Sequence, residues 1–213
     1  MMYVKTDPDG VSNPRRYTLG ELRRDNPSTQ FPKNIPQEIL EEYNVYELHD
    51  AEPPEYDCCT QQLVESWTLD GDVWTRTWTI ESLPVNQIAM NLVEKVADQR
   101  YAKETSGIIW PDSQGKLWYI ATDLDSQGRI DSAVSTVERG DRVENSIWKT
   151  AEINPQTGGF TLTYRPTTNA EILTWGTMVA EYVQKCFTAE ANTVNKIMAG
   201  DFTADFQTEF DAL

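Results

Sequence analysis

The stretch TDLDSQGRIDSA, from Thr122 to Ala133, carries oxygen-bearing side chains at the spacing of a calcium-binding loop. An EF-hand loop takes oxygen ligands at positions 1, 3 and 5, glycine at position 6 and a bidentate glutamate at position 12. The first four of these positions are filled by Asp123, Asp125, Gln127 and Gly128. The twelfth is Val134, so the closing carboxylate is missing. We therefore expect Asp123 or Asp125 to cap a helix that contains Val134, and we predict no calcium site.

Three cysteines are the other candidates for metal or redox chemistry. Cys58 and Cys59 are adjacent, and a disulfide between neighbours strains the backbone, so a thiophilic metal or a redox switch is the functional interpretation of the pair. Two reduced loop thiols are the simpler interpretation. Cys186 lies on the apolar face of an expected helix and is assigned to the core. The sequence thus predicts no metal site and no cofactor.

No catalytic residue is predicted. The single histidine, His49, precedes Asp50, but no serine framed by glycines and no suitably placed cysteine accompanies them. The sequence also lacks an HExxH motif, a phosphate-cradling glycine loop and a zinc spacing of cysteine and histidine. We expect that the protein is not an enzyme.

The charge balance argues against a nucleic-acid ligand. With 18 basic and 34 acidic residues, the 213-residue chain has a net charge of -16 and repels phosphate groups. The opening MMYVKTDPDG lacks the apolar core of a signal peptide, and no apolar run of about 18 residues follows. We expect no direct nucleic-acid partner and no insertion into a membrane.

The elements that position these side chains are expected to form two parts, residues 1–84 and 85–213. The first part has many turn-forming residues between short apolar runs, which predicts a small β-rich domain of the attachment type. Within it we expect a helical turn with a capping box at Thr18, a short helix that starts with Pro36, and a strand over residues 45–48.

The segment QLVESWTLDGDVWTRTWTI predicts a β-hairpin that turns at Asp70 and Gly71. A turn at these two residues makes Trp67 face Trp74, Glu65 face Arg76, and Leu63 face Trp78. All six of these side chains then lie on one side of the hairpin. The stripe formed by Trp67, Trp74 and Trp78 is expected to seal the sheet against a neighbour. Stacking on sugar rings is the alternative.

The second part is expected to be an α+β domain of helices and hairpins. A helix capped by Asn86 and ending near Gly107 comes first, with apolar residues at three- and four-residue spacing. A hairpin that turns at PDSQG, a short helix and a second hairpin, SIWKTAEINPQTGGFTLTY, follow it. A capping box at Thr168 then starts a helix that runs to about Gly200. The whole chain is therefore assigned to the α+β class.

The last helix and the chain end carry a long apolar stripe. Its aromatic and terminal members are Trp175, Tyr182, Phe202, Phe206, Phe210 and Leu213. At about 1.5 Å per residue the helix reaches on the order of 45 Å, which is more than a small domain needs. We expect residues 168–213 to line a subunit interface. The alternative is that the tail folds back on its own domain.

The order of the motifs resembles proteins of phage tails. RRYTLGELRRDNPSTQFPKNIPQEILEEYNVYEL, followed by LDGDVWTRTWTI, resembles the opening of tail-fibre-associated proteins of tailed bacteriophages. RYAKETSGIIWPDSQGKLWYIATDLDSQGRIDSAVSTV, GGFTLTY and ILTWGTMVAEYVQKCF are similar to a phage domain of unknown function that commonly follows it. The resemblance covers residues 17–198 and includes no catalytic signature.

Two short patterns of that domain are matched in this chain. In the family, R-x-x-x-E-T-x-G ends a helix and enters a hairpin, and the matching residues are Arg100, Glu104, Thr105 and Gly107. T-D-x-x-S follows and matches Thr122, Asp123 and Ser126. Arg100 and Glu104 stand at helical spacing, so we expect a structural role for this element.

The resemblance implies a structural component of a phage tail, located in the virion after synthesis in the host cytoplasm. It would be a tail-fibre or baseplate subunit or adaptor that contacts other tail proteins and forms a homo-oligomer, with a trimer favoured because fibres usually are trimers. One alternative is a tail-fibre assembly chaperone that is absent from the finished particle. A second is a host-glycan-binding tail tip that uses the tryptophan stripe. Residue types do not separate a subunit from a chaperone, because both need an adhesive surface.

Overall fold

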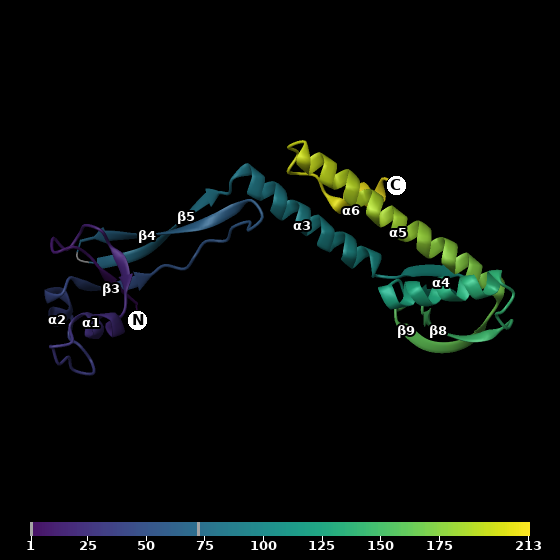
Figure 1. Cartoon of the computed structure of the whole chain (residues 1–213), viewed down its shortest axis with the longest axis horizontal. Coiled ribbons are helices and arrows are strands. Elements are labelled where there is room, and N and C mark those ends of the chain that lie inside the picture. Colours follow the sequence, from purple (N-terminus) through teal and green to yellow (C-terminus); the bar gives the residue numbers. More distant parts are fainter. Residues whose placement is uncertain (1, 72) are drawn as a thin grey trace. The chain divides into compact units, whose positions relative to one another are not determined.

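The structure, a computed structural model, describes residues 2–71 and 73–213. It divides into two compact units, one up to Val85 and one from Asn86 to Leu213. Helices and strands occur in both units (Figure 1), with a strand-rich first unit and a second unit that contains a long helix near its end. The α+β class predicted from the sequence is therefore confirmed.

The first unit is built on a five-stranded sheet. Its strands are β1 (Met2–Lys5), β2 (Arg15–Tyr17), β3 (Val45–Asp50), β4 (Gln61–Asp70) and β5 (Val73–Ser82). The order across the sheet is β2-β1-β3-β5-β4. Neighbouring strands are antiparallel except β3 and β5, which are parallel because the hairpin places β4 at the edge and returns β5 to the side of β3.

Two short helices pack on one face of this sheet. α1 (Leu19–Asp25) begins with the predicted capping box, in which the Thr18 hydroxyl accepts from the backbone N–H of Glu21. α2 (Gln37–Glu42) begins directly after Pro36, which is its N-cap residue and not its first helical residue. The core between helices and sheet consists of Tyr3, Tyr17, Leu22, Leu40 and Val45. Burial of these side chains fixes the helices to β1, β2 and β3.

The hairpin of β4 and β5 turns one residue later than predicted. Asp70 pairs with Val73, so Trp67 lies opposite Arg76, and the predicted pairing of Trp67 with Trp74 is wrong. The turn begins at Gly71, which has a φ of +61°. Glycine adopts such a positive φ with little strain because it has no Cβ. Every partner on β5 is therefore displaced by two residues. Because side chains alternate with a period of two, the stripe still lies on one face of the hairpin.

The second unit combines a four-stranded sheet with four helices in the described residues. Its elements are α3 (Val85–Glu104), β6 (Ile108–Pro111), β7 (Leu117–Ile120), α4 (Leu124–Glu138), β8 (Ser146–Ile153), β9 (Phe160–Thr167), α5 (Asn169–Met198) and α6 (Phe206–Asp211). The sheet is antiparallel throughout and has the order β6-β7-β8-β9. Both predicted hairpins are present, as β6–β7 and β8–β9.

α5 is 30 residues long and begins with the predicted capping box between Thr168 and Glu171. Its length serves two separate hydrophobic clusters. The first half packs Ile172, Trp175 and Val179 against the β6–β9 sheet and α4. The second half packs Cys186, Ala189 and Ile197 against α3 and α6, which run beside it in Figure 1. One helix therefore joins a sheet-on-helix core to a three-helix core.

α3 begins before its predicted cap. The helix includes Val85, so Asn86 lies in its first turn, and the prediction that Asn86 caps it is wrong. Pro84 precedes the helix, and proline is well suited to a helix start because its φ is already near the helical value. In the part of the chain that the structure describes, none of the helices has the length and apolar character that a membrane span requires.

Candidate interaction surface

The C-terminal aromatic stripe folds back on its own unit. Phe206 and Phe210 of α6 are buried, and Phe202 is half-buried against the same cluster. The Phe210 ring stacks edge-on against Tyr182 of α5, with 5.9 Å between the ring centroids. The expectation that this stripe lies exposed for a partner is corrected, because α3 and α5 leave a groove of apolar side chains that α6 fills. Leu213 alone of the stripe remains exposed.

The two aromatic residues predicted on α5 are also engaged within the unit. Trp175 is fully buried. The hydroxyl of the half-buried Tyr182 donates to the carbonyl of Lys103 at 2.8 Å, which fixes α5 to the end of α3. Neither residue offers an open surface.

The tryptophans of the first unit do not form an open platform. Trp74 is buried in a cluster with Val4 and Leu48, and Trp67 is half-buried beside it. The indole N–H of the half-buried Trp78 donates to the carbonyl of Ala51 at 3.1 Å. Sugar stacking requires an exposed ring face, and Trp74 does not present one.

A cluster of tryptophans around Arg165 forms the inner face of the second sheet. The guanidinium carbon lies 4.5 Å from the ring centroid of Trp118, 5.8 Å from that of Trp110 and 5.9 Å from that of Trp175. Arg165 is also paired with Glu171 in the first turn of α5. These cation–π contacts and the ion pair hold α5 on the sheet, so this face is committed to the core.

The residues matched to R-x-x-x-E-T-x-G form a polar junction at the end of α3. Buried Glu104 is paired with Arg100, whose Nε lies 3.3 Å from a carboxylate oxygen of Glu190 on α5. The Thr122 hydroxyl donates to the Glu104 carbonyl and accepts from the Gly107 N–H. This explains why Glu190 interrupts the apolar stripe of α5: its carboxylate forms an ion pair with Arg100 of α3.

The candidate calcium residues belong to a helix start. Asp123 is the N-cap of α4, and its carboxylate accepts from the backbone N–H of Ser126 at 3.1 Å. The hydrogen bond from the Ser126 side chain lowers the pKa of Asp123 below its ordinary value. The capping prediction is confirmed, and the helical backbone from Leu124 onward differs from the coiled course of an EF-hand loop.

The remaining candidates for chemistry lie apart from one another. His49 is exposed on β3, and the carboxylate of Asp50 is paired with Arg76 of β5. Cys186 is fully buried in α5, and burial raises the pKa of its thiol to about 11. A buried neutral thiol is unreactive, which agrees with its assignment to the core.

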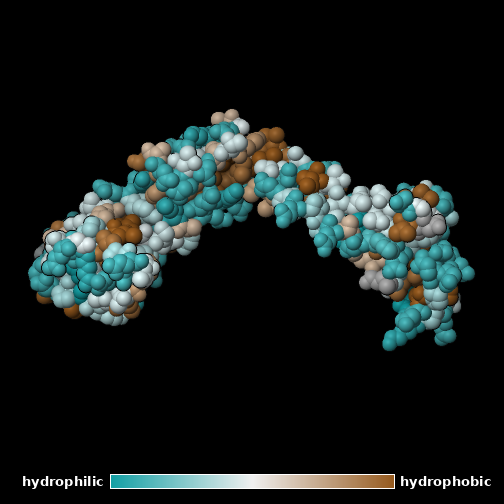
Figure 2. Space-filling view, turned by 180° about the vertical axis from the view of Figure 1, so that it is seen from behind, coloured by the Kyte–Doolittle hydropathy of each residue, from teal (hydrophilic) through white to brown (hydrophobic). Residues whose placement is uncertain are grey.

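The outer face of the second sheet, opposite the tryptophan cluster, carries large apolar side chains that stay exposed. They are Ile109 of β6, Ile147 of β8, and Phe160, Leu162 and Tyr164 of β9, each between 58% and 65% exposed. The strand register places Leu162 opposite Ala151 and Tyr164 opposite Lys149. Apolar residues also reach the surface of this unit in Figure 2, where it lies on the left. A concentration of this kind marks an interaction surface.

A hollow of about 880 Å³ adjoins the outer face. β7 pairs with β8 only at Trp118 and Tyr119, and the first half of β8 extends past the end of β7, beside the start of α4 in the lining of the hollow. The lining includes Tyr119, Ile147, Phe160 and Leu162 from the sheet and Asp123, Ser126 and Arg129 from the α4 region. The hollow is thus an apolar recess with a polar rim.

Two basic side chains, Arg129 and Lys149, line this hollow together with two acidic ones, Asp123 and Asp125. Within residues 2–71 and 73–213, neither Arg129 nor Lys149 makes an ion pair. This contrasts with the net charge of -16 for the whole chain. An apolar surface with charges of both signs at its edge suits a partner that presents apolar groups with charged groups beside them.

This surface was not predicted from the sequence, although a signal for it is present. In FTLTY, residues 160–164, all large apolar side chains alternate with threonine and so share one face of a strand. On the neighbouring strand, Trp148 and Ile147 are adjacent and point to opposite faces. Together these patterns indicate a sheet with apolar residues on both faces, only one of which the helices can cover.

A family model described as "Domain of unknown function (DUF4376)" matches residues 87–212, which span the second unit. No curated protein and no solved structure matches the chain.

Proposed function

This chain belongs to the DUF4376 family, whose function is unknown, and we propose that it is a structural subunit of a bacteriophage tail. It acts through protein–protein assembly and not through catalysis. The motif order over residues 17–198, which resembles tail-fibre-associated phage proteins, supports the tail setting. The outer face of the second sheet is the observation that carries the assembly role.

The proposed partner of the outer face is a second copy of this chain. Arg129 and Lys149 at the edge of this face make no ion pair within the described residues and can pair with carboxylates of a neighbouring copy, since the chain has 34 acidic residues. A contact between this face and a different surface of the next copy is heterologous, and such contacts form a ring when the rotation between copies closes. A ring of three subunits fits the trimeric symmetry expected for tail fibres.

The free energy gained by burying the apolar side chains of the outer face indicates why one contact between two copies is not enough for a stable assembly. Full burial of one such side chain is worth about 1.5 to 3 kcal/mol, so covering the exposed parts of five contributes on the order of 5 kcal/mol. Association costs roughly 4 to 15 kcal/mol in lost freedom. One contact is therefore marginal, whereas a closed ring gives every subunit two contacts.

The test uses Leu162→Asp, which places a charge in the centre of the outer face, and Val143→Asp as the matched control. Val143 is 74% exposed in the loop between α4 and β8 and is not one of the five apolar side chains of the outer face. We expect light scattering to give an oligomer, favoured as a trimer, for the wild type and the control, and a lower mass for Leu162→Asp. Circular dichroism verifies that both variants are folded.

The tail assignment has its own readout. Mass spectrometry of purified virions is expected to find the chain in stoichiometric copy number, with Leu162→Asp reduced and Val143→Asp unchanged. Absence of the chain from virions, with the oligomer intact in solution, contradicts the structural role and favours the assembly chaperone. A wild-type monomer in solution contradicts the self-association.

A further inference from the structure

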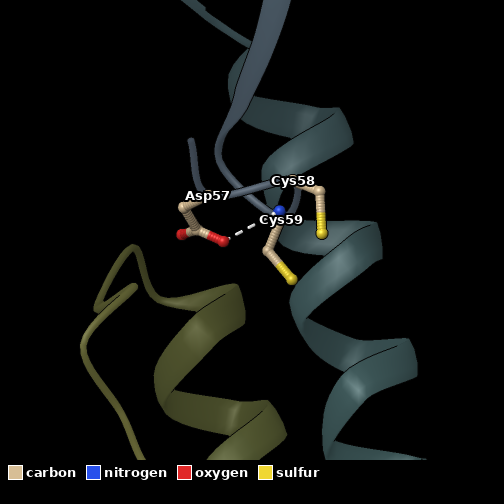
Figure 3. A group of neighbouring side chains, drawn as sticks. All are labelled: Asp57, Cys58 and Cys59. Atoms are coloured by element: carbon tan, nitrogen blue, oxygen red, sulfur yellow. Dashed lines mark hydrogen bonds between the residues drawn. The ribbon is translucent and has the colours of Figure 1, made fainter. Parts of the chain in front are cut away.

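Three consecutive side chains in the first unit combine two thiols with a carboxylate. Asp57, Cys58 and Cys59 lie between β3 and β4, and their ligand atoms are all within 4.8 Å of one another. Cys58 is exposed and Cys59 half-buried, and neither is in a disulfide. Figure 3 shows both sulfur atoms on the same side of the turn, with the Asp57 carboxylate beside Cys59. The three donor groups thus lie together in one turn.

The turn that holds these residues is fixed by hydrogen bonds. The Asp57 carboxylate accepts from the backbone N–H of Cys59 at 3.0 Å and from the Thr60 hydroxyl at 2.8 Å. The backbone carbonyl of Asp57 accepts from the N–H of Gln61 at 2.7 Å. Donors of this kind orient a carboxylate for metal binding in the same way as the outer shell of known metal sites.

The turn is also anchored to the sheet. The carbonyl of Thr60 accepts from the N–H of Leu83 at 2.9 Å, just beyond the end of β5. Because β4 begins at Gln61, the two thiols stand at the base of the β4–β5 hairpin. A ligand held there stabilises a point where two segments of the first unit meet.

We propose that Asp57, Cys58 and Cys59 bind a thiophilic divalent cation of the zinc class. Thiolates with one carboxylate are a soft donor set that prefers Zn²⁺ or Cd²⁺ to Mg²⁺ or Ca²⁺. A tetrahedral site with metal–sulfur bonds of about 2.3 Å separates its ligand atoms by roughly 3.5 to 3.8 Å. The separations in the turn are at most 4.8 Å, so they exceed that value by no more than about 1 Å, which side-chain rotation can close.

The donor count makes this an open site. Three protein ligands leave the fourth tetrahedral position to water or to a ligand from another molecule. The strain of a disulfide between adjacent cysteines disfavours their oxidation to a disulfide, and both remain available as metal ligands. The acidic stretch AEPPEYD that precedes them further favours a cation over an anion.

The test is a titration of the full chain, reduced and freed of metal, with Cd²⁺. We expect one equivalent to bind and to produce the ultraviolet absorption of cadmium–thiolate bonds, and Zn²⁺ to compete for the same site. Cys58→Ser and Cys59→Ser are each expected to weaken binding by about tenfold or more and to lower the thiolate absorption. A large excess of Mg²⁺ is expected to leave the absorption unchanged.

Cys186→Ala is the matched control, since it removes a thiol that is buried in the second unit. Its stoichiometry and affinity are expected to equal those of the wild type. The proposal is overturned if no stoichiometric thiolate absorption develops, if the two serine variants bind as tightly as the wild type, or if Mg²⁺ displaces the bound ion.

Discussion

At the scale of single residues, Gly107 is the most constrained point of the second unit. It joins α3 to β6 with a φ of +83°, and a Cβ placed there would lie 2.2 Å from the ring of Tyr119. Its N–H donates to the Thr122 hydroxyl at 2.8 Å. Two requirements, a left-handed backbone and an absent side chain, therefore meet at one position, and glycine alone satisfies both.

The pair Gly107→Ala and Gly115→Ala separates these two requirements. Gly115 has a similar φ of +76°, but nothing lies within 4 Å of its virtual Cβ. We expect Gly115→Ala to cost about 1 to 2 kcal/mol of unfolding free energy from backbone strain. Gly107→Ala adds an overlap with Tyr119 and is expected to cost roughly 2 to 5 kcal/mol.

Urea unfolding of the two glycine variants measures the difference. Equal losses of stability would show that the Tyr119 ring moves aside without cost, which would contradict a tightly packed junction.

At the scale of elements, α6 is a short helix whose stability depends on what it covers. Asp205 caps it by accepting from the N–H of Thr208 at 2.8 Å. With six residues it is too short to be stable in isolation. Burial of Phe206 and Phe210 against α3 and α5 therefore holds it in place.

Phe210→Ala is expected to destabilise the protein by about 3 to 5 kcal/mol, because it leaves a cavity between α5 and α6. Leu213→Ala is the control, since Leu213 is 55% exposed and its truncation is expected to change stability by less than about 0.5 kcal/mol. Chemical denaturation followed by circular dichroism distinguishes the two. A Phe210→Ala variant as stable as the control would mean that α6 contributes nothing to this core.

At the scale of the whole molecule, each hydrophobic cluster lies within one of the two units. Two clusters lie within residues 2–74, and the other two lie within residues 88–210. Each unit therefore has the core that independent folding requires.

A fragment of residues 85–213 is expected to fold alone, with helical circular dichroism and a single cooperative unfolding transition. A fragment of residues 85–200 is the comparison, because it lacks α6 and exposes the cluster around Cys186. It is expected to be markedly less stable. A disordered 85–213 fragment would show that the second unit depends on the first.

Several local features were predictable from the sequence because they close within a few residues. The capping boxes at Thr18 and Thr168 and the cap at Asp123 each join a side chain to a backbone N–H three residues later. Glycine-containing turns and strand alternation predicted the β6–β7 and β8–β9 hairpins in the same way. These interactions need no information from distant parts of the chain, so residue type and spacing determined them.

Tertiary structure decided which apolar faces are covered. The sequence marked the stripe of Phe202, Phe206 and Phe210 as apolar, but the groove that buries it is made by α5 together with α3, which lies about a hundred residues earlier. The partner of Arg100 on α5 and the exposure of Leu162 on the outer face depend in the same way on contacts between distant elements. Local pattern shows that a face is apolar, whereas only the packing of distant elements decides whether it becomes core or surface.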